Sequence, residues 1–151
     1  MIYICQNMQN IKFIGAPKSI LNEDTISSLL VRFARGEGYK IDKLEYNFVD
    51  SEKMYSLNKD YLNHSTDTDI ITFDYSTNKD ILAEVYISKK MMTENAISHS
   101  QPTENELIRL VSHALFHCMG YKDKSAEEKE IMRSKEEGFL SAVSRETRQN
   151  V

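Results

Sequence analysis

The chain has 151 residues, of which 40% are hydrophobic and 28% charged, so the sequence predicts one globular domain over residues 1–151 with a substantial core. Its formal net charge of −4 argues against a nucleic-acid interface that covers the whole surface, since such surfaces are typically basic, but it leaves room for a local basic cleft. The sequence contains neither the ~18 uninterrupted apolar residues of a membrane span nor the regions of a secretion signal, and we expect a cytoplasmic protein whose two cysteines, Cys5 and Cys118, are reduced.

The first third of the chain is expected to contain two strands and one helix. Residues 1–7 predict an edge strand. A helix is predicted to begin at Pro17 and to end at Gly36 or Gly38, because glycine can leave a helix at low steric cost. Residues 44–49 alternate apolar and polar side chains, which indicates a strand with one buried face.

The middle third is expected to continue with helices and strands in turn. Asp50 or Ser51 can cap a second helix. The β-branched and apolar run at 69–73 is typical of a central strand that is covered on both faces. Residues 84–88 predict the next strand, and residues 90–99 predict a third helix.

The last third is expected to be helical. Thr103 with Glu106, and Ser125 with Glu128, have the spacing of a capping box, in which two side chains satisfy backbone N–H groups at a helix start. Two helices are therefore predicted, one from residue 103 and one from 126 to about 143. About four strands and five helices in this order predict an α+β fold with a small mixed four-stranded sheet and helices on both sides.

The helix predicted from residue 103 carries two histidines, His113 and His117, four residues apart. At ~1.5 Å rise per residue they lie about 6 Å apart along the axis and on one helix face, so both can reach one metal ion. They border an apolar stripe made of Leu107, Leu110, Val111, Ala114, Leu115 and Cys118. Gly120 can then turn the chain so that Asp123 returns toward the imidazoles. Three protein ligands without a fourth are typical of a catalytic zinc site with a position open for water.

Two other interpretations of this helix are possible. Two histidines at this spacing also occur by chance, as half-exposed side chains with ordinary hydrogen bonds. A zinc peptidase helix requires Glu directly after the first histidine as general base, and the chain has Ala114 there. The turn and the carboxylate that follow at once favour metal binding over a chance arrangement, and Ala114 argues against a zinc peptidase.

Two further patterns occur in a fixed order along the chain. The earlier one reads Leu-Asn-Lys-Asp-Tyr at 57–61 and continues as Thr-Asp-Ile-Ile-Thr-Phe at 68–73. The later one reads His-Ala-Leu-Phe-His-Cys-Met-Gly-Tyr-Lys-Asp at 113–123. In this order and spacing, both patterns resemble the signatures of the YbeY family of bacterial metal-dependent endoribonucleases, and the resemblance runs over most of the chain.

The resemblance implies a metal site that is also the catalytic site. It implies that His113 and His117 are zinc ligands and that Asp123 takes the place of the family's usual third histidine. One Zn²⁺ per chain is expected, although two histidines and one carboxylate also suit Fe(II), Mn(II) or Ni(II). Lys122 and Lys124, beside the ligands in sequence, would lie close to a bound phosphate and are the predicted substrate-binding residues.

Besides Asp123, the chain departs from the family pattern at three further places. Leu62 stands where the family usually has an arginine that is thought to act in RNA cleavage, and Ala83-Glu84-Val85 replaces Gly-Asp-Ile. Ala114 replaces the glycine after the first histidine. Because a lysine offers a point charge and not a bidentate fork, we expect weaker activity than in family members that keep the arginine.

The function implied by the resemblance is metal-dependent cleavage of single-stranded RNA in 16S rRNA 3′-end maturation and ribosome quality control. Ribosomal RNA and the small ribosomal subunit are the implied partners, and no membrane is involved. Leu62 leaves open a non-catalytic ribosome-assembly factor with a structural metal. A zinc metallopeptidase is the less favoured alternative, because Ala114 cannot act as a base.

Overall fold

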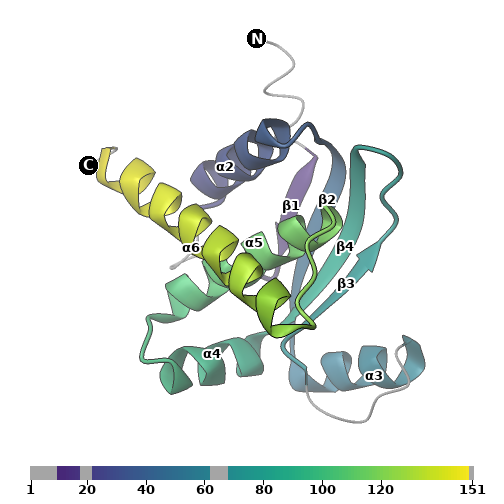
Figure 1. Ribbon diagram of the computed structural model, residues 1–151. Helices are drawn as coiled ribbons and strands as arrows, with labels where there is room; N and C mark the ends of the chain where they lie inside the picture. Colours follow the sequence, from purple (N-terminus) through teal and green to yellow (C-terminus); the bar gives the residue numbers. More distant parts are fainter. Residues whose placement is uncertain (1–9, 18–21, 62–67, 150–151) are drawn as a thin grey trace.

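The computed structural model describes residues 10–17, 22–61 and 68–149, and these form a four-stranded mixed sheet with five helices (Figure 1). The strands are β1 (Ile11–Ile14), β2 (Lys40–Val49), β3 (Ile70–Asp74) and β4 (Asp80–Ser88). The helices are α2 (Glu23–Gly36), α3 (Ser51–Tyr61), α4 (Lys89–Ser98), α5 (Thr103–Cys118) and α6 (Ala126–Gln149). The predicted α+β fold is confirmed.

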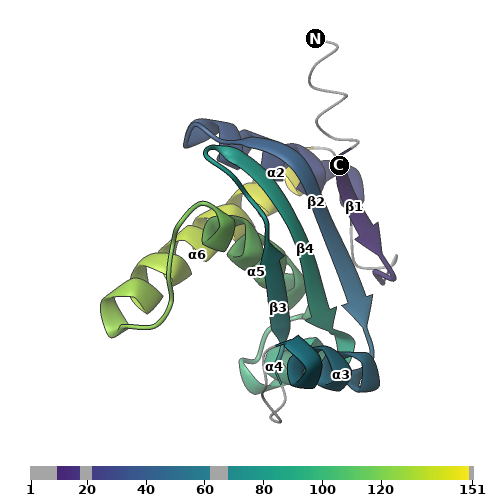
Figure 2. The same ribbon diagram turned by 90° about the vertical axis from the view of Figure 1, so that its right-hand side faces the viewer.

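The sheet has the strand order β1-β2-β4-β3. The first three strands in this order are parallel to one another, and β3 runs antiparallel to β4. Alternate residues of β4 point to opposite faces, so Ile81, Ala83, Val85 and Ile87 are all buried on one side. Figure 2 shows α2, α5 and α6 on that side, whereas α3 and α4 lie at one end of the sheet.

Helix α5 is held against the middle of the sheet by its apolar stripe and by one hydrogen bond. The stripe residues Leu107, Leu110, Val111, Ala114 and Leu115 are at most 1% exposed, as predicted. The hydroxyl of Tyr46 on β2, itself fully buried, donates to the carbonyl oxygen of Val111 at 2.8 Å. This bond fixes the height of α5 over the sheet, because a buried hydroxyl without its partner would destabilise the fold.

The stripe provides a direct stability test. Leu110→Ala is expected to lower the free energy of unfolding by about 2–5 kcal/mol, the usual cost of removing a buried leucine side chain. Leu82→Ala is a matched control, because Leu82 is 38% exposed on β4 and should cost far less. Urea unfolding measures both. Equal stability of Leu110→Ala and wild type would contradict the burial of this stripe.

Helix α3 covers the opposite face of the sheet at one end. Met54 and Leu57 pack there with Ile71, while Ile70, the preceding residue of β3, packs into the main core. Helices therefore lie on both sides, as predicted. The prediction that residues 69–73 form a central strand is wrong, because β3 is at the sheet edge. The sequence of β3 is apolar because helices cover both of its faces, although only one of its edges is paired with another strand.

One helix start differs from the prediction, and one predicted cap is absent although its helix begins where expected. The helix expected from Pro17 begins at Glu23, where Asn22 accepts a hydrogen bond from the Thr25 backbone N–H at 3.1 Å. Helix α5 begins at Thr103 as predicted, but the predicted capping box is absent: Pro102 is the N-cap, and the Glu106 carboxylate is bound by Arg109. The second capping box, Ser125 with Glu128, forms as predicted.

Two further predicted elements remain: the last helix is longer than predicted, and the first strand lies outside the described residues. Helix α6 continues past residue 143 to Gln149, and Glu146 pairs with Arg32 of α2 at 3.1 Å. The strand predicted at residues 1–7 lies outside the described residues, and β1 is the strand beside β2.

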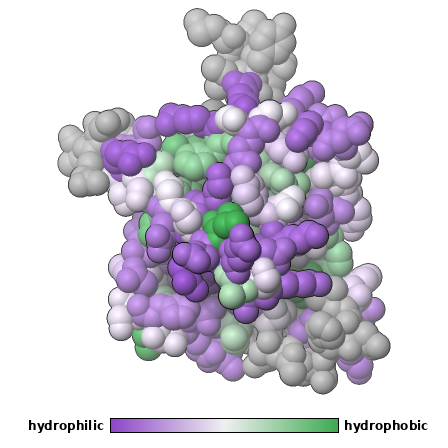
Figure 3. Space-filling model, viewed as in Figure 1, coloured by the Kyte–Doolittle hydropathy of each residue, from purple (hydrophilic) through white to green (hydrophobic). Residues whose placement is uncertain are grey.

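Polar side chains cover the outward side of α6, and the surface seen from that side is mostly hydrophilic (Figure 3). None of the described helices is long and apolar enough to cross a membrane.

Candidate metal centre

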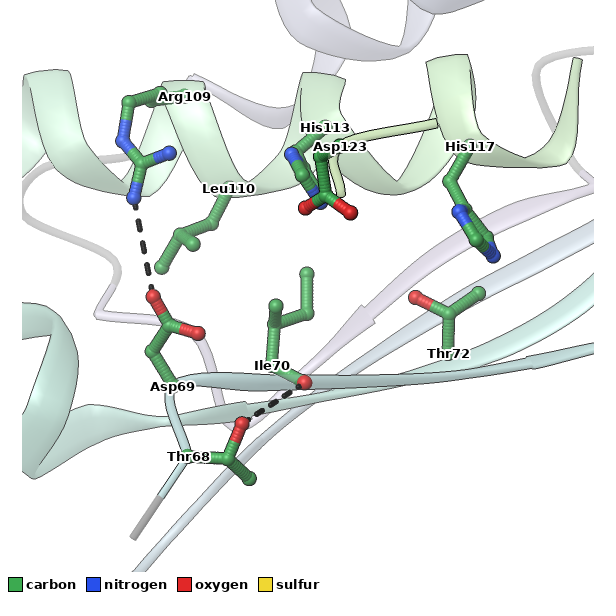
Figure 4. Close-up of a pocket in the computed structure, with 9 residues that line it drawn as sticks. All are labelled: Thr68, Asp69, Ile70, Thr72, Arg109, Leu110, His113, His117 and Asp123. Atoms are coloured by element: carbon green, nitrogen blue, oxygen red, sulfur yellow. Dashed lines mark hydrogen bonds and ion pairs between the residues drawn. The ribbon is translucent and has the colours of Figure 1, made fainter. Parts of the chain in front are cut away.

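A pocket of about 360 Å³ lies between α5 and β3 (Figure 4). It is lined by Thr68, Asp69, Ile70, Thr72, Arg109, Leu110, His113, His117 and Asp123. Three of these residues are the predicted metal ligands, which come from α5 and from the loop after it. The two histidines and the carboxylate therefore line one pocket, with His113 half-buried and His117 exposed.

The loop after α5 turns as predicted at Gly120. Gly120 has φ +97°, a left-handed conformation that L side chains rarely adopt, and its N–H donates to the carbonyl of His117 at 3.0 Å. The next N–H, of Tyr121, donates to the carbonyl of Phe116 at 3.1 Å. This helix end reverses the chain and brings Asp123 back to the face that carries the histidines.

Two tyrosine hydroxyls tie the same loop to the rest of the domain. Tyr39 donates to the backbone carbonyl of Met119 at 3.1 Å, and Tyr121 donates to the carboxylate of Glu37 at 2.8 Å. The ammonium of Lys135 lies over the Tyr121 ring at 5.1 Å. Both ends of the short connection between α5 and Asp123 are therefore fixed by groups outside the pocket.

His113 has a defined orientation in the pocket. Its Nδ1 lies 2.7 Å from Oε2 of Glu136 on α6, which is a hydrogen-bond distance. Its Nε2 lies 3.4 Å from Oδ2 of Asp123, which is longer than a good N–H···O hydrogen bond. The imidazole therefore uses Nδ1 for a buried carboxylate and directs Nε2 toward Asp123.

His117 is less closely placed. It is exposed, and in Figure 4 its ring lies one helical turn beyond His113, above Thr72 of β3. Within the described parts of the chain, no three His, Cys, Asp or Glu side chains are arranged so that they could hold a metal ion. His113 and Asp123 are thus brought together, and His117 lines the same pocket without completing a ligand set.

The donor groups nevertheless suit a first-row metal ion. At bond lengths of about 2.0–2.2 Å and a tetrahedral angle, two ligand atoms of one zinc ion lie roughly 3.4 Å apart. Nε2 of His113 and Oδ2 of Asp123 have this separation. An exposed side chain such as His117 changes rotamer within picoseconds to nanoseconds, so its ring is free to turn toward the same point.

A charged network that the sequence prediction missed lies at the end of the pocket nearest Asp69. Arg109 donates from Nε and Nη2 to the two carboxylate oxygens of Glu106 at 2.9 and 2.6 Å, and from Nη1 to Glu136 at 3.4 Å. Its Nη2 also lies 3.8 Å from Asp69, which accepts a hydrogen bond from Asn95 at 3.0 Å. The hydrogen bonds to Glu106 raise the pKa of Arg109, with burial opposing them. The guanidinium is therefore charged, and it is hydrogen-bonded to the carboxylates of Glu106 and Glu136.

The pocket and this network carry more negative than positive groups. The carboxylates are Asp69, Glu106, Asp123 and Glu136, and Arg109 is the cation among them. Such an excess of negative charge favours a bound cation.

Glu136 could have been found in the sequence. Met132, Glu136, Phe139 and Val143 follow one another at helical spacing on α6, so a carboxylate occupies a position in a buried apolar stripe. A charged residue at such a position is almost always paired. Its partner, His113, is 23 residues away and could not be identified from spacing.

The predicted substrate-binding lysines are not in the pocket wall. Lys122 and Lys124 are exposed and lie on the loop beside Asp123, and the Lys124 backbone N–H donates to Glu128 at 3.2 Å. Leu62 lies outside the described residues. Ala83, which stands where the family usually has glycine, is buried in the core. Burial raises the pKa of the Cys118 thiol to about 12, as expected for a core cysteine that is not a ligand.

Comparison with known proteins agrees with this fold and pocket. The model of the family Endoribonuclease YbeY matches residues 12–144, and the chain belongs to this family. A protein named Endoribonuclease YbeY from Flavobacterium johnsoniae is 39% identical over 114 residues, which cover 76% of this chain and 79% of that protein. A protein of the same name from Cytophaga hutchinsonii is 41% identical over 117 residues, which cover 77% and 82%.

A solved structure supports the fold alone. The solution structure of TM1509 from Thermotoga maritima matches 93% of this chain and 93% of its own length, with a TM-score of 0.68 and 23% sequence identity. The α+β fold described above therefore also occurs in an experimentally determined structure.

Proposed function

We propose that this protein is a metal-dependent endoribonuclease that hydrolyses single-stranded RNA in the pocket between α5 and β3. The observation that carries the proposal is the position of His113, His117 and Asp123 in one pocket of a chain that belongs to the Endoribonuclease YbeY family. The proposed substrate is ribosomal RNA at the 16S 3′ end, with the small ribosomal subunit as partner and the cytoplasm as location. The proposed cofactor is one Zn²⁺.

The chain's own residues have distinct roles in this proposal. Nε2 of His113, His117 and Asp123 would hold the ion. When bound, the metal would supply a Lewis acid for a phosphoryl oxygen and lower the pKa of water toward ~7. The surrounding carboxylates repel a phosphodiester that enters without a cation, which supports the dependence of RNA cleavage on the metal.

The experiment that tests the proposal compares one preparation in three states. Purified protein is assayed on single-stranded and duplex RNA of the same sequence, then after chelation and dialysis, then after return of Zn²⁺ or Mn²⁺. We expect cleavage of the single strand, loss on chelation and recovery with metal. Cleavage that survives complete removal of metal would contradict metal dependence, and equal cleavage of the duplex would contradict strand selectivity.

The same assay separates the alternatives. A protein that binds metal tightly and does not cleave RNA would be a non-catalytic assembly factor, the alternative that Leu62 keeps open. The metallopeptidase alternative has little support, because Ala114 is fully buried and no base occupies the position after the first histidine.

A separate prediction concerns positive charge for the phosphate. Alanine at both Lys122 and Lys124 is expected to lower RNA cleavage several-fold without loss of metal, since two lysine charges flank Asp123 in the sequence. Leu62→Arg is expected to raise cleavage. Lysines outside this loop serve as controls, and alanine at both Lys89 and Lys90 of α4 should change cleavage less. If RNA cleavage is measurable and neither the double alanine variant of Lys122 and Lys124 nor Leu62→Arg changes its rate, this account of phosphate binding is wrong.

A further inference from the structure

The buried carboxylate of Glu136 faces the candidate metal centre from a helix that contributes none of the predicted ligands. Glu136 lies on α6 and is 5% exposed. Its Oε2 lies 2.7 Å from Nδ1 of His113, and its Oε1 accepts from Arg109 at 3.4 Å. Both oxygens therefore have partners, and the acidic side chain is held between two residues of α5 that lie one helical turn apart.

We propose that Glu136 is the positioning residue of the metal centre, because it fixes the tautomer and the ring orientation of His113. A carboxylate accepts hydrogen bonds, so Nδ1 of His113 must carry the proton in this contact. In the neutral imidazole, a proton on Nδ1 leaves the lone pair on Nε2, the nitrogen that faces Asp123 at 3.4 Å. Glu136 thus prepares the nitrogen that the metal would bind.

The second contact of Glu136 explains why its carboxylate keeps its place. Arg109 binds Glu106 with two hydrogen bonds and reaches Glu136 with Nη1. Arg109 is therefore anchored independently of Glu136 and holds one oxygen, which leaves the other directed at His113. Partners of this kind around a metal-binding histidine typically change metal affinity by about 10–100-fold.

This inference rests on the proposed function for its metal, but the hydrogen bond itself can be tested in the metal-free protein. Nitrogen-15 NMR distinguishes an imidazole that is protonated on Nδ1 from one that is protonated on Nε2. The neutral imidazole of His113 in the metal-free wild type is expected to carry its proton on Nδ1. Histidine spectra of His113→Ala assign the signal. A proton on Nε2 in the wild type would overturn the inference.

The variants Glu136→Met and Glu136→Gln separate positioning from a merely structural role. Methionine fills a similar volume without an acceptor, whereas glutamine keeps one acceptor oxygen. Competition with a chromophoric chelator is expected to show about 10–100-fold weaker Zn²⁺ binding for Glu136→Met, with part of the affinity restored in Glu136→Gln. Glu136→Met should also shift His113 toward the Nε2-protonated tautomer. Glu137→Met, an exposed neighbour on α6, is the matched control and should leave both readouts unchanged.

The outcomes distinguish this inference from the proposed function. If Glu136→Met keeps the wild-type affinity and tautomer while His113→Ala loses zinc, the positioning role is wrong and the metal site stands. If the wild type binds no zinc, the proposed function fails, and the tautomer of metal-free His113 still decides whether Glu136 orients it. A lower melting temperature of Glu136→Met with an unchanged tautomer would indicate a structural role alone and contradict the inference.

Discussion

His113→Ala or His117→Ala is expected to reduce bound zinc from about one ion per chain to near zero. Each change removes one of three protein ligands, and a site left with two ligands loses most of its affinity. Metal content is measured by elemental analysis after dialysis against a weak chelator, and RNA cleavage is measured on the same samples. We expect cleavage to fall with the metal.

A matched control is available for this experiment. His99 follows α4 and is exposed, and it does not line the pocket between α5 and β3. His99→Ala should keep both metal and activity. Stoichiometric metal in the double variant of His113 and His117 would place the binding site elsewhere in the chain.

Arg109→Met is expected to produce the largest loss of stability among single changes near the pocket. The side chains of Glu106 and Glu136 are only 2% and 6% exposed, and the guanidinium is 2.6 Å from the first and 3.4 Å from the second. Removing the cation leaves two nearly buried carboxylates without a counter-charge, which typically costs about 3–5 kcal/mol. For a domain of this size the melting temperature should fall by on the order of 10 °C.

Two comparisons make this prediction specific. Arg32→Met removes a guanidinium whose side chain is 61% exposed and paired with Glu146, and an exposed pair contributes about 1 kcal/mol or less. Adding Glu106→Gln to Arg109→Met should recover part of the loss, because it neutralises the carboxylate left unpaired. A melting temperature of Arg109→Met equal to that of Arg32→Met would show that the network contributes no more than a surface ion pair.

The sequence predicted those elements whose pattern is local. The stripe on α5, the turn at Gly120 and the capping box at Ser125 depend on residues within a few positions of one another, and the structure has all three. The capping box expected at Thr103 fails for a reason that is also local, since Arg109 competes for the Glu106 carboxylate. The spacing of Thr103 and Glu106 does not show whether the Glu106 carboxylate binds the backbone at the helix start or the side chain of Arg109.

Features that depend on tertiary packing were not predictable in the same way. The edge position of β3 depends on strand order, and an apolar run on both faces does not distinguish an edge strand covered by helices from a central strand. The contact between Glu136 and His113 joins two helices, and its only sequence signal was a carboxylate within the apolar stripe of α6. The placement of His117 relative to the other two predicted ligands depends on a rotamer of an exposed side chain.

The three tyrosine hydroxyls that hold α5 and its following loop have a consequence for conformational entropy. Tyr46 fixes the middle of the helix, and Tyr39 and Tyr121 fix the loop that leads to Asp123. Ordering a backbone residue costs about 1–2 kcal/mol, and here that cost is incurred when the chain folds and not when an ion binds. A ligand entering this pocket therefore meets a frame that is already ordered, and only exposed side chains such as His117 must lose freedom on binding.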